Sequence, residues 1–141
     1  MILDEAQPYK DKVIELLAAE NLPVADLPKT LDNFIVAIQD GSVVGVGGVE
    51  VYGKFGLLRS LATQSDYRGT GIAAKVLARL DKVSKLKGLS ALYLLTETAP
   101  DYFERKGFVR ITRVEVPQEI QQSTEFSHVC PVSAIVMKKT L

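Results

Sequence analysis

The sequence has no tryptophan, one histidine and one cysteine among its 141 residues. The single cysteine, Cys130, excludes a disulfide within the chain and suits a reducing compartment, so we expect the protein to be cytoplasmic. One thiol also argues against a soft-metal trap, because such a trap takes several thiolates from the protein. His128 and Cys130 lie two residues apart, but they have no further obvious partners, and we predict no metal site.

The sequence also lacks an excess of one charge, with 17 Lys and Arg against 17 Asp and Glu. Because there is no basic block, we expect no nucleic-acid partner. The sequence has no apolar run near the length of a membrane span and no basic start followed by an apolar core, so we expect no signal peptide and no membrane partner. The hydrophobic content of 47% is typical of a globular protein. The length suits one core, and we predict a single domain over residues 1–141.

Hydrophobic periodicity predicts a mixture of strands and helices. Strands are expected at residues 34–38, 43–52, 55–63, 91–95, 108–112 and 134–138, with a stub at 1–3, and helices at 11–20, 70–87, 99–106 and 117–122. Asp40-Gly41 and Gly53-Lys54 are expected turns between successive strands. A helical crossover joins strand 55–63 to strand 91–95, which should therefore be parallel. The predicted fold class is α/β (α+β), with a mixed, mostly antiparallel sheet, one parallel crossover and helices on both faces.

The chain is organised around the stretch from residue 57 to residue 88. An apolar run over residues 57–62 predicts a buried strand, and from Thr70 the apolar residues recur at helical spacing. A loop with Gly69 and Gly71 lies between them. The loop and the helix would aim several backbone N–H groups and the positive end of a helix dipole at one point. We therefore predict an anion site, with phosphate as its ligand.

The run Arg68-Gly69-Thr70-Gly71-Ile72-Ala73 has arginine in its first place, glycine in its fourth and alanine in its sixth. It resembles the (Gln/Arg)-x-x-Gly-x-(Gly/Ala) signature of the GCN5-related N-acetyltransferases. The segment Thr96–Phe108 is similar to a later helix of the family that ends in a Gly-Phe pair. A narrower resemblance is to an arsenic-resistance branch of the family, and it is carried by the runs LLRSLA and LLTETAPDYFERKGF and by the tail TEFSHVCPVSAIVMKK. The same branch resemblance implies that Glu125 and Ser127 reach the substrate from their loop.

The resemblance implies an N-acetyltransferase that moves an acetyl group from acetyl-CoA to the amine of a small molecule, an amino acid or a toxic amino-acid analogue. It places the pyrophosphate on the backbone N–H groups of Arg68, Gly69, Thr70, Gly71, Ile72 and Ala73. It pairs the pantetheine arm with main-chain groups of Leu61, Ala62 and Thr63, in a gap expected between this strand and the strand at 91–95. Thr96 and Phe103 are the further candidates for contacts with acetyl-CoA.

Two charged residues interrupt the apolar strands, and such residues are normally paired or functional. If Gly53-Lys54 is a two-residue turn, Glu50 lies opposite Leu57, and Arg59 is its diagonal neighbour on the same face. One interpretation is a structural ion pair. The other is that Glu50 handles the substrate's ammonium group, as catalytic base and as binding group, while Arg59 receives the substrate's carboxylate.

A proton donor for the leaving thiolate is harder to identify. An alkyl amine with a pKa of about 10 must lose a proton before it attacks, and the thiolate must gain one. Many family members have a tyrosine four residues before the glycine of the Gly-Phe pair, but this sequence has Phe103 there. Tyr102 is one residue earlier, which turns it by about 100° around a helix. It is the candidate acid, and solvent or positioning alone are the alternatives.

Three other interpretations stay open. The segment from Gly69 to Ala74 also satisfies the dinucleotide pattern Gly-x-Gly-x-x-(Gly/Ala), but a polar loop separates it from its strand and too little chain remains for a doubly wound sheet. The presence of Phe103 allows a non-catalytic module that only binds acyl-CoA. The family resemblance also allows a homodimer.

Overall fold

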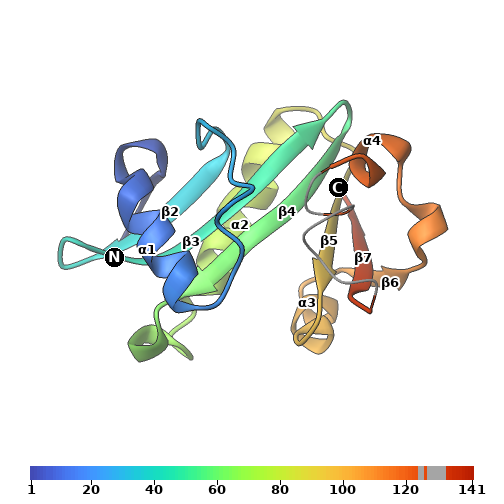
Figure 1. Ribbon diagram of the computed structural model, residues 1–141. Coiled ribbons are helices and arrows are strands. Elements are labelled where there is room, and N and C mark those ends of the chain that lie inside the picture. The colour runs from blue at the N-terminus through green and yellow to red at the C-terminus, as the bar shows by residue number, and fades with distance from the viewer. Residues whose placement is uncertain (124–125, 127–132) are drawn as a thin grey trace. The chain divides into compact units, whose positions relative to one another are not determined.

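The computed structural model describes residues 1–123, 126 and 133–141. These residues form a seven-stranded mixed sheet in the order β1-β2-β3-β4-β5-β7-β6 (Figure 1). The strands are β1 (Ile2–Glu5), β2 (Phe34–Gln39), β3 (Ser42–Tyr52), β4 (Phe55–Thr63), β5 (Ala91–Thr96), β6 (Val109–Ile111) and β7 (Ile135–Thr140). The α-helices are α1 (Lys10–Ala19), α2 (Ile72–Leu86), α3 (Pro100–Arg105) and α4 (Gln118–Gln121).

The predicted fold class is confirmed. β4 and β5 pair in parallel, with Phe55 opposite Ala91 and Leu57 opposite Tyr93, whereas β1–β2, β2–β3, β5–β7 and β6–β7 pair antiparallel. Each predicted strand and helix is present, with shifts at its ends. No helix in the described ranges is both long and apolar enough to cross a bilayer.

Both predicted turns are two residues long. Asp40 and Gly41 connect β2 to β3 with φ of 52° and 80°. Positive φ at both central residues is the geometry whose twist matches that of a hairpin. Gly53, with φ of 64°, and Lys54 connect β3 to β4. The even turn that the Glu50 hypothesis required is therefore present.

Two predicted ends are corrected by local backbone geometry. The helix expected from Thr70 begins at Ile72, because Gly69 and Gly71 have φ of 78° and 85°, which no α-helix accommodates. The strand expected over residues 108–112 covers only Val109–Ile111. Thr112 instead begins a 3₁₀ turn, η3 (Arg113–Glu115), where Thr112 and Glu115 form a capping box.

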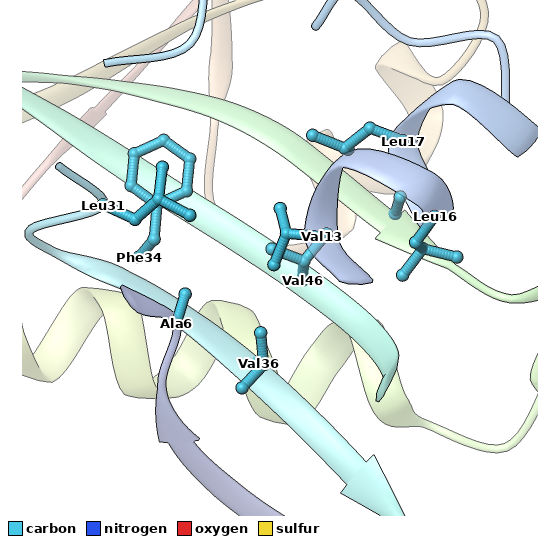
Figure 2. Close-up of a cluster of buried hydrophobic side chains, with 9 residues drawn as sticks. Ala6, Val13, Leu16, Leu17, Leu31, Phe34, Val36 and Val46 are labelled. Carbon is cyan, nitrogen blue, oxygen red and sulfur yellow. The ribbon is translucent and has the colours of Figure 1, made fainter. Parts of the chain in front are cut away.

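One compact unit comprises Met1–Val49 and Arg59–Ser84. In it, side chains of α1 lie beside Val46 of β3, and Leu31 lies beside Phe34 (Figure 2). On the other face of β3, a Cβ at Gly47 would meet Val76 and Leu80 of α2 within about 3 Å. Helices therefore cover both faces of the sheet in this unit, as predicted.

The other compact unit comprises Glu50–Leu58 and Lys85–Leu141. Its buried core brings together β4, β5, β7 and the segment around α4, with partly buried aromatic rings packed against it. The buried members are Leu57, Ala91, Tyr93, Val116, Ile120 and Val136.

Candidate active site

The loop that begins α2 is open on its outer side. It follows a 3₁₀ turn, η2 (Ser65–Tyr67), and contains Gly69 and Gly71 in the left-handed region. A Cβ built on either glycine would meet nothing within 4 Å. A backbone without side chains and without neighbours allows a ligand to approach its N–H groups closely.

The backbone N–H groups of residues 69–73 donate none of the hydrogen bonds formed among the described residues. On either side of this run, Arg68 N–H is bonded to the Ser65 carbonyl at 3.3 Å and Lys75 N–H to the Gly71 carbonyl at 3.1 Å. The first turn of a helix has no internal acceptors for its N–H groups, and the helix dipole adds positive potential there. The loop thus presents the donors that an anion needs.

The side chains of the loop hold its shape. The Thr70 hydroxyl donates to the carbonyl of Tyr67, three residues earlier. The guanidinium of Arg68, 64% exposed, pairs with Glu20 at the end of α1. Of the six predicted phosphate-binding residues, Arg68 therefore differs from the others, because both its N–H and its side chain already have partners within the chain.

A backbone irregularity lies in β4 immediately before Leu61, Ala62 and Thr63. Ser60 has φ of 58°, a left-handed conformation that is uncommon for any residue other than glycine. Strained backbone in a strand is found at functional sites more often than elsewhere. The sequence analysis predicts a gap between these residues and β5. Because β5 belongs to the other compact unit, the gap stays a prediction.

Arg59 is buried and bonded at two points to Asp26, in the segment between α1 and β2. Its Nη1 donates to Oδ2 at 2.8 Å and its Nη2 to Oδ1 at 2.9 Å, while Nη1 also reaches the Asp26 carbonyl oxygen at 3.3 Å. The side chains are 1% and 3% exposed. Asp26 was missed in the sequence, where it is one acidic residue among several in a segment without periodicity.

Glu50 lies near the end of β3, and Tyr52 bonds to it. The Tyr52 hydroxyl donates to Glu50 Oε2 at 2.7 Å. A hydroxyl donated to one oxygen restricts the rotation of the carboxylate and leaves its second oxygen to other partners. Glu50 belongs to the second unit and Arg59 to the first, so their predicted proximity stays a prediction.

The Tyr102 hydroxyl, in α3, is buried and has no hydrogen-bond partner within the described part of the chain. Burial raises the pKa of Tyr102 above its ordinary value of 10.0, an effect that the nearby charge of Arg105 partly offsets. The hydroxyl therefore keeps its proton at neutral pH. A buried hydroxyl without a partner is unusual, and an unseen partner such as a ligand is one physical explanation.

Phe103 packs edge-on against two rings, with centroid separations of 5.3 Å to Tyr102 and 5.7 Å to Phe108. Thr96, at the end of β5, accepts a hydrogen bond from Ala99 N–H at 3.1 Å through its Oγ1. That bond shapes the turn into α3. Among the described residues, no three His, Cys, Asp or Glu side chains gather as metal ligands. Glu125, Ser127, His128 and Cys130 lie outside the described residues.

A family model for the acetyltransferase (GNAT) domain matches residues 30–110, more than half of the chain. The chain belongs to the GNAT acetyltransferase family. An amino-acid acetyltransferase of Ralstonia nicotianae is 27% identical over 115 residues, which are 80% of this chain but only 25% of that protein. An uncharacterized N-acetyltransferase of Chlorobaculum tepidum is 28% identical over 120 residues, 84% of this chain and 77% of that protein.

Solved structures of this GNAT fold match nearly the whole chain. Rv2747 of Mycobacterium tuberculosis, in complex with CoA, has a TM-score of 0.80 at 21% identity and covers 100% of this chain and 99% of its own. N-acetylglutamate synthase of Neisseria gonorrhoeae, in complex with CoA and N-acetyl-glutamate, has a TM-score of 0.81 at 16% identity, covering 99% of this chain and 35% of its own. These likenesses establish the fold.

Acetyl-CoA is the co-substrate of the GNAT family, and the loop of this chain fits it. The unbonded N–H groups of residues 69–73 and the open space over Gly69 and Gly71 suit a diphosphate. A dinucleotide site, the competing interpretation of the same glycines, belongs to a doubly wound parallel sheet, whereas this sheet has one parallel pair.

Proposed function

We propose that the protein transfers the acetyl group of acetyl-CoA to the amine of an amino acid or an amino-acid analogue. The observation that carries this proposal is the run of unbonded N–H groups over residues 69–73 at the start of α2. The names of two similar proteins, an amino-acid acetyltransferase and an N-acetylglutamate synthase, support the choice of an amino acid. We take residues 1–141 as one catalytic domain.

The N–H groups of residues 69–73 hold the diphosphate, with Arg68 completing the loop. Main-chain groups of Leu61, Ala62 and Thr63 pair with the amides of the pantetheine arm, and Thr96 and Phe103 contact the same molecule. When bound, acetyl-CoA supplies the activated acetyl thioester.

Glu50 accepts a proton from the substrate's ammonium group, directly or through a water, so that the neutral amine can attack. The hydroxyl that Tyr52 donates at 2.7 Å holds the Glu50 carboxylate in one orientation. The amine forms its bond to the acetyl carbon as the carbon–sulfur bond breaks. Tyr102 then gives its proton to the departing sulfur, and its raised pKa keeps that proton available at neutral pH.

The hypothesis that Arg59 receives the substrate's carboxylate now competes with a specific alternative. Asp26 occupies both terminal nitrogens of Arg59, and both side chains are almost fully buried. A substrate carboxylate at Arg59 would have to displace Asp26 and bury a second negative charge beside it. We therefore assign Arg59 to an ion pair with Asp26, a partner that the sequence analysis did not name.

An assay of thiol release tests this function. The purified chain, acetyl-CoA and a panel of amino acids are combined, with arsenic-containing amino-acid analogues as one set and N-blocked amino acids as the control. We expect thiol release with at least one free amine and none with its N-blocked form. Activity confined to the arsenic-containing set would support the arsenic-resistance branch, and no release with any amine would overturn the enzyme proposal.

A second candidate is a module that binds acyl-CoA without catalysis, and Phe103 at the usual position of the tyrosine acid favours it. Thermal unfolding separates the candidates, because a ligand that binds only the folded state raises Tm. Stabilisation by acetyl-CoA without thiol release indicates the module, and stabilisation by NAD alone indicates a dinucleotide site. A cytoplasmic location, a homodimer and the absence of a nucleic-acid partner remain parts of the proposal.

A further inference from the structure

The side chain of Arg59 connects two places in the first unit. Its Nη1 and Nη2 are bonded to Asp26, and its Nε donates to the hydroxyl of Ser60 at 3.1 Å. Every nitrogen of the guanidinium thus has an acceptor, and the geometry with Asp26 is the two-point arrangement that fixes a guanidinium in one orientation. Asp26 is therefore connected through the Arg59 guanidinium to Ser60, the residue of β4 that has left-handed backbone geometry.

The segment that carries Asp26 is itself anchored. Val24 and Leu27, on either side of it, pack against the hydrophobic core that α1 forms with β2 and β3. An aspartate between two packed apolar residues has little freedom to follow the arginine. The pair accordingly fixes Arg59 relative to the α1 side of the sheet.

Side-chain directions along β4 change where Ser60 lies. Leu61 lies with Val76 and Leu80 of α2, since all three are within about 3 Å of a Cβ built at Gly47. Ala62 belongs to the core on the α1 side. In a regular strand, alternate residues share a face, so Arg59 would point to α2 with Leu61.

Arg59 instead extends to Asp26, whose neighbours pack on the α1 side. The alternation is therefore broken between Arg59 and Leu61. A single left-handed residue at Ser60 accounts for the break, in the manner of a β-bulge. A break of this kind changes the directions in which the following backbone N–H and C=O groups, those of residues 61–63, point.

We propose that Asp26 is a positioning residue for the acetyl-CoA site. By fixing Arg59, it holds Ser60 in the left-handed conformation and so sets the direction of the main-chain groups of Leu61, Ala62 and Thr63. This inference rests on the proposed function, in which those groups contact acetyl-CoA. Asp26 itself contacts neither substrate and acts only through Arg59 and Ser60.

Variants at Ser60 test the proposal without disturbing the ion pair. Glycine adopts positive φ at little cost, whereas alanine loses the hydroxyl and keeps the penalty of a left-handed residue. We expect Ser60→Ala to raise Kd for CoA and KM for acetyl-CoA by about tenfold. Ser60→Gly should remain near the wild type in both, although it also lacks the bond from Arg59. Equal effects of the two substitutions would overturn the proposal.

Combining substitutions tests Asp26 itself. Asp26→Asn should raise KM for acetyl-CoA by about tenfold in the wild-type chain and by clearly less in the Ser60→Gly chain, because glycine needs less help to stay left-handed. Asp32→Asn is the control, since Asp32 is exposed in the same segment and its carboxylate bonds only to the neighbouring Thr30 among the bonds described. A purely structural role for Asp26 would lower Tm and give the same change of KM in both backgrounds, and that result would overturn the inference.

The outcomes separate this inference from the proposed function. Binding of CoA by the wild type, together with equal affinities of Ser60→Ala and Ser60→Gly, would remove the role of Asp26 and keep the enzyme. Absence of CoA binding by the wild type would remove both. Where Asp26→Asn fails to fold, equal affinities of the two Ser60 variants still overturn the proposal, and unequal affinities support its step from Ser60 to residues 61–63.

Discussion

Two regions of the first unit differ in whether their polar groups have hydrogen-bond partners. At Arg59 in β4, each guanidinium nitrogen donates to an acceptor within the chain, and burial is nearly complete. At the start of α2, consecutive backbone N–H groups over residues 69–73 have no acceptor in the described structure, and a Cβ added at Gly69 or Gly71 would meet nothing within 4 Å.

The difference indicates which region a ligand completes. A charged pair that is satisfied and buried gains nothing from a further anion, and separating it costs a large desolvation penalty. Unbonded N–H groups at a helix N-terminus gain a full set of charge-assisted bonds when an anion arrives. This difference supports our proposals that the α2 loop binds the ligand and that Asp26 acts as a positioning residue through Arg59.

Gly71→Asp should break this comparison most strongly. The substitution puts a carboxylate where the diphosphate would lie and forces a side chain onto a backbone with φ of 85°. The backbone strain lowers the stability of the free and the bound protein alike, whereas the loss of charge-assisted bonds to the diphosphate amounts to about 4 kcal/mol, or about a thousandfold in Kd for CoA. Isothermal titration with CoA measures the change.

Gly88→Asp is the matched control for this substitution. Gly88 follows the other end of the same helix, has φ of 79° and would also have no neighbour within 4 Å of an added Cβ. We expect both variants to lose similar stability, whereas only Gly71→Asp loses affinity. If the Gly88 variant lost as much affinity, the α2 loop would have no special role in binding.

Tyr102→Phe extends the comparison between satisfied and unsatisfied polar groups to a third case. The Tyr102 hydroxyl is buried, like Arg59, but it has no partner among the described residues, like the N–H groups at the start of α2. We expect kcat to fall by about 100-fold, as for the loss of a general acid. The stability of the free protein should stay the same or increase, because a buried hydroxyl without a partner is removed. Steady-state kinetics and urea unfolding measure the two effects, and unchanged kcat would dismiss the proton donor.

The pH dependence provides an independent check on Tyr102. Its pKa is raised above 10.0, so the folded state holds the proton more tightly than the unfolded state. The protonated acid is therefore present at neutral pH, and on the alkaline side wild-type kcat should fall as the pH rises through the raised pKa. The same linkage makes the folded state lose stability above pH 10.0. Neither decline should occur to the same extent in Tyr102→Phe.

Features that depend on neighbouring residues in the chain could be predicted from the sequence. The strand, the glycine loop and the amphipathic helix around Gly71 each have a local pattern, and the binding that we propose for the loop uses backbone groups that any sequence with this shape supplies. The turn at Asp40-Gly41 is equally local, because both residues tolerate positive φ. Both α2 and the hairpin were predicted to within a few residues for that reason.

Features that depend on distant contacts could not be predicted in the same way. The bond from Arg59 to Asp26 spans 33 positions, and Asp26 lies in a segment without helical or strand periodicity. Ser60 is left-handed although serine has no local preference for that conformation in a strand. We propose that the bond from Arg59, which Asp26 fixes from a distant part of the chain, maintains this conformation. The partner of Arg59 and the left-handed conformation of Ser60 therefore became apparent only in the structure.

The smallest loss of stability is expected from a substitution of Glu115. Like Arg59, Glu115 has hydrogen-bond partners within the chain, but its side chain is exposed to water. Its carboxylate accepts from the backbone N–H and the hydroxyl of Thr112 at 3.0 and 2.9 Å. These bonds, led by the backbone N–H, lower the pKa of Glu115 below its ordinary value of 4.5. Glu115→Gln should lower Tm slightly at neutral pH and leave kcat unchanged.

The sign of the pH dependence follows from the lowered pKa. The folded state binds the Glu115 proton more weakly than the unfolded state, so the stabilisation is present above pH 4.5 and is lost as the pH falls through the folded pKa. The difference in Tm between the wild type and Glu115→Gln should therefore shrink in acid. Glu119→Gln removes the same charge without a bond to Thr112 and serves as the control. If Glu115→Gln lowered Tm as much as Asp26→Asn does, burial would not explain the difference between the two sites.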